Sequence, residues 1–295
     1  MIDFSAIAAG ISESAGVLCE PAPAQSVGGG SLNECYRWRS DRETLFVKIA
    51  EHSKQPMLEA EADSLRELMQ TGAIRVPQVR AIGSNDQHAF LALEWIEHQA
   101  RASESSEARL GEQLAQLHRV TATKFGWHRD NTIGFTPQKN ERSESWLTFY
   151  RDQRLGFQLD LIVENGYGAE LEKSGRLLLE RLEKLLDGHE PQPSLLHGDL
   201  WGGNWFAASS GEPVIFDPAC YFGDREADIA MTYLFGGYGP AFYAAYEASW
   251  PLGDGHARRR DLYNLYHVLN HANLFGGGYI RQARGLIEAL LKLHS

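Results

Sequence analysis

Residues 195–205 read Leu-Leu-His-Gly-Asp-Leu-Trp-Gly-Gly-Asn-Trp, and the expected fold follows from this stretch. Two apolar residues lead into a His-Gly-Asp triplet that ends at Asp199, and Asn204 follows five positions later. A second apolar run, residues 214–216, leads to Asp217. Phosphoryl transfer needs a carboxylate at the attacking hydroxyl, and amide or carboxylate oxygens that hold magnesium against the phosphates. The spacing therefore predicts a site for ATP and Mg²⁺, with Asp199 as the catalytic residue and Asn204 and Asp217 as metal ligands.

The residues and spacing of these motifs resemble those of known kinases. Protein kinases carry His-Arg-Asp, an Asn five residues after the Asp, and Asp-Phe-Gly. Here Gly198 replaces the arginine and the second motif is Asp-Pro-Ala, which is typical of the aminoglycoside and choline kinase branch. The fuller pattern His-Gly-Asp-Leu-Trp-x-Gly-Asn resembles the fructosamine-3-kinase family, also called ketosamine kinases. The alternative is a β-hairpin with scattered polar residues, and it does not account for the joint spacing of the three side chains.

Composition limits the classes of protein that the chain can belong to. Its 295 residues are 43% hydrophobic and 23% charged, which is ordinary for a globular protein with a large core. The net charge of −11 argues against nucleic-acid or anionic-membrane partners, because both need a basic surface. We find neither a membrane-spanning run nor a signal-peptide pattern, and three scattered cysteines suit neither disulfides nor zinc. These features predict a cytoplasmic protein, and they leave the oligomeric state open.

A glycine-rich loop and a strand lysine supply the expected phosphate-binding groups. Glycines let backbone N–H groups approach a phosphate, so the loop Gly28, Gly29, Gly30 and Ser31 is a candidate, although a plain hairpin turn has the same composition. The resemblance places a cysteine at the position of Ser31 in many members, which argues against redox control there. Lys48, near the end of the strand predicted over residues 44–49, would neutralise phosphate charge.

The resemblance implies further roles for residues that carry no signature of their own. Glu61, on a helix predicted over residues 57–70, would pair with Lys48, and Glu59 is the competing acid. The backbone of Glu94, Trp95 and Ile96 would read adenine at a hinge. His197 and Asp228 would support the catalytic loop, although an acid at a helix start is also common without such a role.

Acceptor residues are the least constrained part of the interpretation. Trp201 directly follows the catalytic segment and could stack on a sugar, or it could be a core residue that supports the loop. The tract around His271 and Asn273 resembles the family and could line the acceptor site or pack inside a helix. Residues 125–150 hold aromatic and amide side chains that could frame a sugar or cap their own backbone. His267 and His271 are four residues apart, but a third metal ligand is missing nearby.

The resemblance covers nearly the whole chain and implies an α+β, bilobal protein-kinase-like fold, with a small mixed β-sheet N-lobe and a mainly helical C-lobe. We expect a nucleotide-binding lobe over residues 1–93, a hinge over 94–98, and a catalytic and acceptor-binding lobe over 99–295. Apolar residues at helical spacing predict helices near residues 3–14, 110–118 and 150–186, and another helix after residue 223.

The function implied is ATP-dependent phosphorylation of a ketosamine at O-3 of its sugar, which is fructosamine, ribulosamine or erythrulosamine on an amine. The phosphate would then leave by β-elimination and free the amine, which is deglycation. One alternative is a kinase for another small molecule such as an aminoglycoside, choline or homoserine. A second alternative, of a different class, is an ATP-binding sensor without turnover. The chain argues against it because it retains all five expected site residues, namely Lys48, Glu61, Asp199, Asn204 and Asp217.

Overall fold

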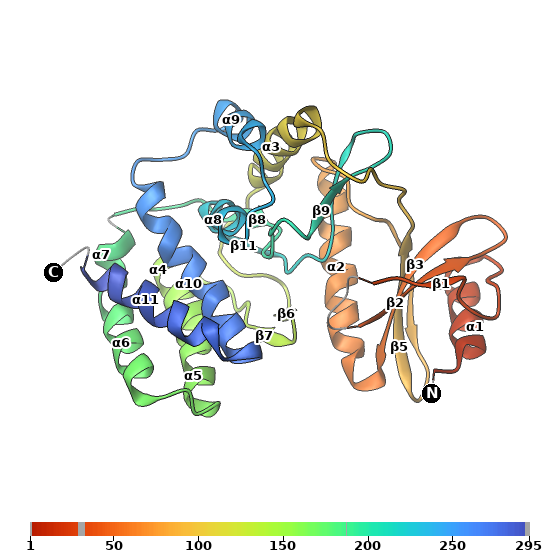
Figure 1. The fold of residues 1–295 in the computed structure, drawn as a ribbon, viewed down its shortest axis with the longest axis horizontal. Coiled ribbons are helices and arrows are strands. Elements are labelled where there is room, and N and C mark those ends of the chain that lie inside the picture. Colours follow the sequence, from red (N-terminus) through yellow and green to blue (C-terminus); the bar gives the residue numbers. More distant parts are fainter. Residues whose placement is uncertain (1, 29–32, 187, 293–295) are drawn as a thin grey trace. The chain divides into compact units, whose positions relative to one another are not determined.

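The computed structural model describes residues 2–28, 33–186 and 188–292 (Figure 1). The chain divides into two compact units, described separately below. Unit 1 comprises residues 1–106 and 205–218, and unit 2 comprises residues 107–204 and 219–295. The segment 94–98 that we expected to be a hinge lies within unit 1, and the functional division at this segment stays a prediction.

Unit 1 is built on a five-stranded sheet with the strand order β1-β2-β3-β5-β4. The family resemblance implies a mixed sheet, and the structure differs in this detail, since each described strand pair of this sheet is antiparallel. A separate two-stranded ladder, β9 with β10, also belongs to unit 1. The elements are α1 Phe4–Ala15, β1 Gln25–Ser26, β2 Glu34–Arg39, β3 Thr44–Glu51, α2 Gln55–Thr71, β4 Val79–Ser84, β5 His88–Glu94, β9 Trp205–Ala207 and β10 Pro213–Ile215.

The alternation of β3 decides which side chains reach the core of unit 1. Successive strand residues point to opposite faces, so Leu45, Val47 and Ile49 share one face, where they join a buried cluster with Ile7 and Ile11 of α1. Lys48 consequently points to the other face, toward α2. Helix α1 begins at a cap in which Asp3 accepts a hydrogen bond from the Ala6 N–H.

Unit 2 is mainly helical and also holds the two-stranded ladders β11 with β8 and β6 with β7. The elements are α3 Glu104–His118, β6 Asn131–Ile133, β7 Thr136–Gln138, α4 Trp146–Tyr150, the π-helical segment η2 Arg151–Gly156, α5 Phe157–Glu164, α6 Ala169–Glu180, α7 Leu182–Leu186, β8 Ser194–Leu196, β11 Tyr221–Gly223, α8 Glu226–Leu234, α9 Pro240–Ser249, α10 His256–Phe275 and α11 Gly278–Lys292.

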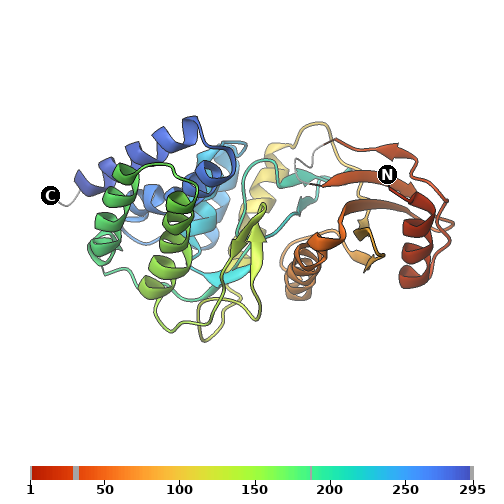
Figure 2. The same cartoon turned by 90° about the horizontal axis from the view of Figure 1, so that it is seen from below.

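The helix predicted over residues 150–186 is broken where glycines adopt left-handed backbone conformations. Gly166 and Gly168 have φ values of 71° and 102°, and α5 ends before them. Helix α10 is the most deeply buried long helix, with eleven buried residues between Arg259 and Ala272. Figure 2 shows α10 and α11 running beside α5 and α6 within unit 2. The ladder β8–β11 brings residue 196, just before the catalytic stretch, beside residue 221, and this pairing positions the candidate site.

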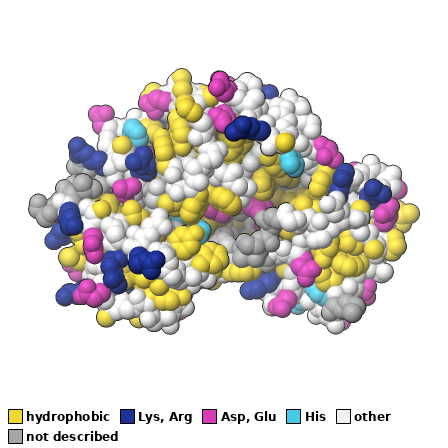
Figure 3. Space-filling model, viewed as in Figure 1, with side chains coloured by type: hydrophobic (Ala, Val, Ile, Leu, Met, Phe, Trp, Pro, Cys, Tyr) yellow, Lys and Arg dark blue, Asp and Glu magenta, His cyan; other side chains and the backbone are white. Residues whose placement is uncertain are grey.

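The surface agrees with the composition. On the face drawn in Figure 3, basic and acidic side chains are interspersed, and no broad basic field appears on it. No helix within the described ranges is both long enough and apolar enough to cross a membrane.

Candidate active site

Unit 1 brings three of the predicted residues together. The Lys48 ammonium lies 2.8 Å from Glu61 Oε1 and 2.5 Å from Asp217 Oδ1. Lys48 comes from β3, Glu61 from α2, and Asp217 follows β10, so three separate segments converge on one cation. Lys48 and Glu61 are nearly enclosed, whereas 39% of the Asp217 side chain is exposed. Glu59 instead accepts a hydrogen bond from Gln55, so the structure pairs Lys48 with Glu61 rather than with the competing acid.

Electrostatics keep the lysine charged. Burial alone would lower the pKa of Lys48, but the carboxylates of Asp217 and Glu61 raise it well above its ordinary value. Asp217 has a φ of 55°, and it is the one non-glycine residue in the described ranges with a positive φ. Such a backbone costs on the order of 1–3 kcal/mol and persists where the surrounding structure enforces it. The cluster therefore presents a fixed positive charge beside a carboxylate that remains open to solvent.

Unit 2 holds the catalytic loop. Asn204 Nδ2 donates to the backbone oxygen of Asp199 at 2.9 Å and to its carboxylate Oδ2 at 3.3 Å. The Asp199 N–H donates to Nδ1 of His197 at 3.2 Å, which makes Nδ1 the acceptor and leaves the ring proton on Nε2. His197 is fully buried. These bonds tie the amide, the acid and the preceding histidine into one rigid turn.

Asp228 braces this turn from α8. Its carboxylate accepts the N–H of His197 at 2.7 Å and the N–H of Gly198 at 2.9 Å. Burial alone would raise the pKa of Asp228, but hydrogen bonds from His118 and from the loop backbone lower it, so it stays ionised. His118 completes the support by contacting both Asp228 and the Tyr246 hydroxyl. These contacts place the Asp228 carboxylate against the loop, and the supporting role that we expected for His197 and Asp228 stays a prediction.

Glycine at position 198 has a steric cause. Gly198 has a φ of 83°, and a Cβ added there would lie 2.1 Å from the Ala219 carbonyl oxygen. A side chain as large as the arginine of protein kinases does not fit in this arrangement. The difference between His-Gly-Asp and His-Arg-Asp is thus a consequence of how closely the residues after Asp217 approach the loop.

Each unit holds a side-chain oxygen of a kind that suits a hard divalent cation. In unit 2, Asn204 bonds Asp199 through Nδ2 rather than through its amide oxygen, and in unit 1, Asp217 offers a carboxylate that is 39% exposed. Amide and carboxylate oxygens are the ligands that Mg²⁺ prefers. The residues present therefore fit the metal that the sequence implies.

A family model described as fructosamine kinase matches residues 3–293. The chain belongs to the fructosamine kinase family. This membership confirms the resemblance seen in the motifs, and the match spans both units of the structure.

Relatives of this fructosamine kinase family member agree with that result. A Synechocystis protein whose name assigns it to the ketoamine kinases is 41% identical over 291 residues, which is 98% of this chain and 97% of the relative. A rice protein named chloroplastic protein-ribulosamine 3-kinase is 40% identical over 91% of this chain and 78% of its own length. A crystal structure from Haemophilus somnus, whose name assigns it to the fructosamine-3-kinases, has a TM-score of 0.88 and 33% identity, covering 97% and 96% of the two chains. The similarity confirms the predicted α+β kinase-like fold class.

Part of the nucleotide-binding prediction for this family member lies outside the described residues. These positions are Gly29, Gly30 and Ser31. Gly28 is described and exposed. At the expected hinge the Trp95 N–H donates to the Thr44 carbonyl at 3.3 Å, and the Glu94 carboxylate pairs with Arg75. The backbone N–H of Trp95 is therefore already hydrogen-bonded to β3.

The predicted acceptor residues of this fructosamine kinase family member fall into two groups. Trp201 is 40% exposed, and its ring lies so close to Gly203 that a Cβ there would meet ring atoms at 2.2–2.5 Å. The Phe235 ring lies between, with its centroid 6.3 Å from that of Trp201 and 5.1 Å from that of His271. Asn273 instead donates to Gln158 and accepts from Asn165, so its amide is used within the helical unit.

His271 has a defined tautomer. Its Nδ1 donates to the His267 carbonyl at 2.7 Å, so Nε2 carries the lone pair. Burial lowers the pKa of His271, and it also lowers the pKa of His267 to about 3, so both rings are neutral near neutral pH. Sequence reasoning missed Phe235, whose only signal was an apolar residue followed by two glycines.

Cys35 is a packed residue in this family member. It lies on β2 opposite Lys48 in the register and is 5% exposed. Burial raises the pKa of its thiol to about 11. Because the thiolate is the reactive form, burial and the raised pKa lower the reactivity of this thiol at neutral pH.

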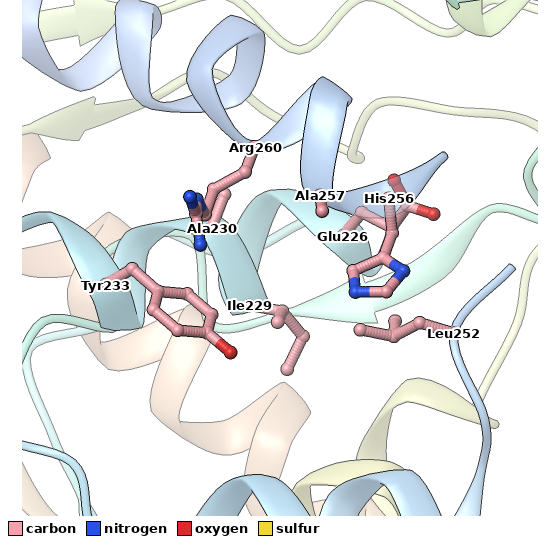
Figure 4. Close-up of a pocket in the computed structure, with 8 residues that line it drawn as sticks. All are labelled: Glu226, Ile229, Ala230, Tyr233, Leu252, His256, Ala257 and Arg260. Atoms are coloured by element: carbon pink, nitrogen blue, oxygen red, sulfur yellow. The ribbon is translucent and has the colours of Figure 1, made fainter. Parts of the chain in front are cut away.

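Two other features lie apart from the predicted site residues. Within the described ranges, one cluster has the composition of a metal site, namely His189, Asp224 and Glu226. The Arg259 guanidinium binds both oxygens of Glu226 at 2.7 Å and so already supplies a cation there. A shallow pocket drawn in Figure 4 lies between α8 and the start of α10, with Tyr233 and Arg260 on one side. None of the residues predicted from the sequence lines this pocket.

Proposed function

We propose that the protein is an ATP-dependent ketosamine 3-kinase, which transfers the γ-phosphate of ATP to O-3 of the sugar. Membership of the fructosamine kinase family supports the reaction class, and the printed names of the relatives support the acceptor class. The observation that carries the proposal is the loop at Asp199, where an acid is fixed by Asn204 and by the backbone contacts of Asp228.

Asp199 is the proposed catalytic base. Its carboxylate orients the acceptor hydroxyl and takes its proton as the new P–O bond forms, while the bond from the γ-phosphorus to the bridging oxygen of ADP breaks. Asn204 restrains the carboxylate through the contact at 3.3 Å. The contribution of the loop is mainly positional, since Asp228 and His197 hold the backbone on either side of the reacting group.

Asn204 and Asp217 are the proposed ligands of Mg²⁺. When bound, this ion would offset the negative charge that accumulates on the phosphate oxygens. Lys48 would present a second, permanent positive charge to the phosphates. Glu61 would hold the Lys48 ammonium group in position through their ion pair. Gly28 to Ser31 and the backbone of residues 94–96 remain the proposed contacts to phosphate and adenine.

The proposed acceptor wall consists of Trp201, Phe235 and His271. Aromatic faces suit the C–H surface of a sugar, and the neutral His271 Nε2 can accept a hydrogen bond from a sugar hydroxyl. Asn273 is not assigned to this wall because its amide already bonds Gln158 and Asn165. The 3-phosphate of the product can leave by β-elimination, which frees the amine and completes deglycation.

The test is ATP-dependent phosphate transfer to ribulose-lysine, erythrulose-lysine, fructose-lysine, kanamycin and choline. We expect turnover on at least one ketosamine and a ranking among the three sugars. Turnover confined to kanamycin or choline would contradict the acceptor class and favour another small-molecule kinase. ATP binding with silence on the whole panel would contradict the enzyme assignment and favour the sensor.

Asp199→Ala tests the catalytic assignment in the same assay. We expect this variant to bind Mg-ATP with wild-type affinity and to lose phosphate transfer by about three or more orders of magnitude, as expected for removal of a positioned group. Nucleotide affinity is measured by titration calorimetry, and transfer by product formation. Near-wild-type transfer by Asp199→Ala would defeat the assignment.

A further inference from the structure

Residues 131–140 carry three buried amide side chains to which the proposed function assigns no role. Asn131, Gln138 and Asn140 are 6%, 1% and 1% exposed. They lie on or next to the hairpin β6–β7. The sequence left open whether these amides frame a sugar or cap backbone, and their burial favours the second alternative.

A buried arginine starts a chain of hydrogen bonds through these amides. Arg154, in the π-helical segment η2, is fully buried, and its guanidinium lies 4.0 Å from the centroid of the Tyr221 ring and 4.5 Å from that of Phe149. No carboxylate in the described part of the chain forms an ion pair with it. Its Nη2 donates instead to Asn140 Oδ1 at 2.8 Å. Its Nη1 donates to the carbonyls of Lys139 and Gln153, so the buried guanidinium is satisfied by neutral oxygens.

The donor-only guanidinium fixes the direction of every amide that follows. Because Asn140 presents its oxygen to Arg154, its Nδ2 donates to Asn131 Oδ1 at 2.8 Å. Asn131 then directs its own Nδ2 to the Cys220 carbonyl at 2.9 Å. Gln138 Nε2 donates to Asn131 Oδ1 and to the Ala219 carbonyl, and its Oε1 accepts from the Tyr266 hydroxyl at 2.8 Å. Each amide orientation is thus determined without a choice.

This series of hydrogen bonds ends on the carbonyls of two consecutive residues, Ala219 and Cys220, and Ala219 also contacts the catalytic loop. The Ala219 N–H donates to the His197 carbonyl at 2.8 Å. The Ala219 oxygen, which accepts from Gln138 at 3.1 Å, is the atom that a Cβ at Gly198 would strike. Ala219 is therefore held between the Gln138 amide on one side and the loop that carries Asp199 on the other.

We propose that Gln138, oriented by Asn131 and Tyr266, is a positioning residue for phosphoryl transfer, because it sets the place of the His197–Asp199 backbone through Ala219. The inference rests on the proposed function for its reaction. Asp228 holds the same loop through its N–H groups, whereas Gln138 acts through the carbonyl side. Both the N–H groups and a carbonyl group of the loop backbone are consequently hydrogen-bonded.

Gln138→Met is the primary test, because methionine retains the length of the side chain and removes its donors and acceptor. We expect kcat to fall by about 10- to 100-fold, since a displacement of about 1 Å at a reacting group has effects of this size. KM for ATP should stay within about twofold, because Lys48 and Glu61 are not touched. A loss confined to thermal stability, with kcat within twofold of wild type, would overturn the inference.

Thr232→Val is the matched control. It removes the hydrogen bonds of a different buried side chain of unit 2, from Thr232 Oγ1 to the Ile229 carbonyl and between Thr232 Oγ1 and the Tyr243 hydroxyl, without touching Ala219 or Cys220. We expect it to lower the melting temperature and leave kcat unchanged. Equal loss of kcat in Thr232→Val and Gln138→Met would show a general effect of stability and contradict the positioning role.

Two further measurements test the proposal if Gln138→Met does not fold or if no acceptor is turned over. If Gln138→Met does not fold, Tyr266→Phe removes the hydroxyl that orients Gln138, and a kcat within 1.5-fold of wild type would reject the proposal. Where both variants fold, their kcat effects should be less than additive, because both act through one bond. Hydrogen exchange of peptides covering residues 196–200 needs no acceptor: faster exchange in Gln138→Met supports the inference, and unchanged exchange opposes it. A wild-type protein that is silent on every ketosamine overturns the proposed function alone.

Discussion

The two clusters of site residues are stabilised by different physics. In unit 1, Lys48, Glu61 and Asp217 hold one another through opposite charges at 2.5–2.8 Å. In unit 2, the loop at Asp199 is held by Asp228 through the N–H groups of His197 and Gly198, and by the Ala219 N–H through the His197 carbonyl. One cluster fixes side-chain charges, and the other fixes the course of the main chain.

The difference suits the roles that we propose for the two clusters. Charges that meet phosphate must exchange partners when the nucleotide arrives, and an ion pair can do this because its attraction is broad in direction. A catalytic base must stay within a fraction of an ångström of its reacting position, and several directional hydrogen bonds to the backbone provide such precision. Substitutions in unit 2 should therefore act through geometry, and those in unit 1 through charge.

Gly198→Ala should have the largest effect, because it breaks the geometric cluster. The added methyl would lie 2.1 Å from the Ala219 oxygen at a φ of 83°. We expect kcat to fall on the order of 10³-fold and the melting temperature by roughly 6 °C or more. Steady-state kinetics and calorimetry measure both quantities.

Gly285→Ala is the control for that substitution. Gly285 lies in α11, where an added Cβ would meet nothing within 4 Å and the φ is not positive, so alanine should stabilise the helix by about 0.5–1 kcal/mol. A fall of kcat in Gly285→Ala, or its absence in Gly198→Ala, would contradict the geometric interpretation.

Lys48→Met should have the next largest effect, through charge. It removes the cation shared by Glu61 and Asp217 and is expected to lower kcat/KM for ATP by about 10²-fold. Lys124→Met, which breaks an exposed pair with Glu144, should leave kcat/KM unchanged. An equal loss in both variants, or no loss in Lys48→Met, would remove the distinction between the clusters.

His189→Gln should have the smallest effect, on stability alone. Burial by itself would lower the pKa of His189, but its hydrogen bond and attraction to Asp224 raise it above the ordinary value near 6.5. A raised folded-state pKa stabilises the protein fully below the unfolded value, and this gain is lost as the pH rises through the folded value. The variant should therefore melt roughly 2–4 °C lower at pH 5.5 and approach wild type at pH 9.

Exposed His52 provides the comparison, and His52→Gln should change the melting temperature by about 1 °C or less, because substitutions at exposed sites have small effects on stability. If the melting temperature of His189→Gln fell further below that of wild type as the pH rose, the sign of this linkage would be wrong.

The sequence predicted those features that depend on local pattern. Alternation located β3 and placed Lys48 on it, and helical spacing located α1 and α2 to within two residues at each end. The motif spacing led to Asp199, Asn204 and Asp217, because consecutive short strands fix where each side chain emerges. The roles assigned to these residues stay predictions, which the variants above test.

The remainder depended on contacts between segments far apart in sequence. Gln138 and Ala219 are 81 residues apart, so no local pattern could show that a motif amide binds the backbone after Asp217. Asn273 looked like an acceptor residue, but Gln158, 115 positions earlier, takes up its amide. The family resemblance implied a mixed sheet, and the register of the strands shows antiparallel pairs, a detail that the resemblance could not supply.

Cys35 lies opposite Lys48 on the neighbouring strand, with the pKa of its thiol raised to about 11. Such a thiol is almost entirely protonated at neutral pH, whereas an ordinary cysteine has a pKa near 8.5 and is partly ionised. Alkylation of Cys35 is therefore expected to be slow in the folded protein, because its side chain is 5% exposed. The labelling rate of this side chain should consequently report local opening of the sheet that carries Lys48.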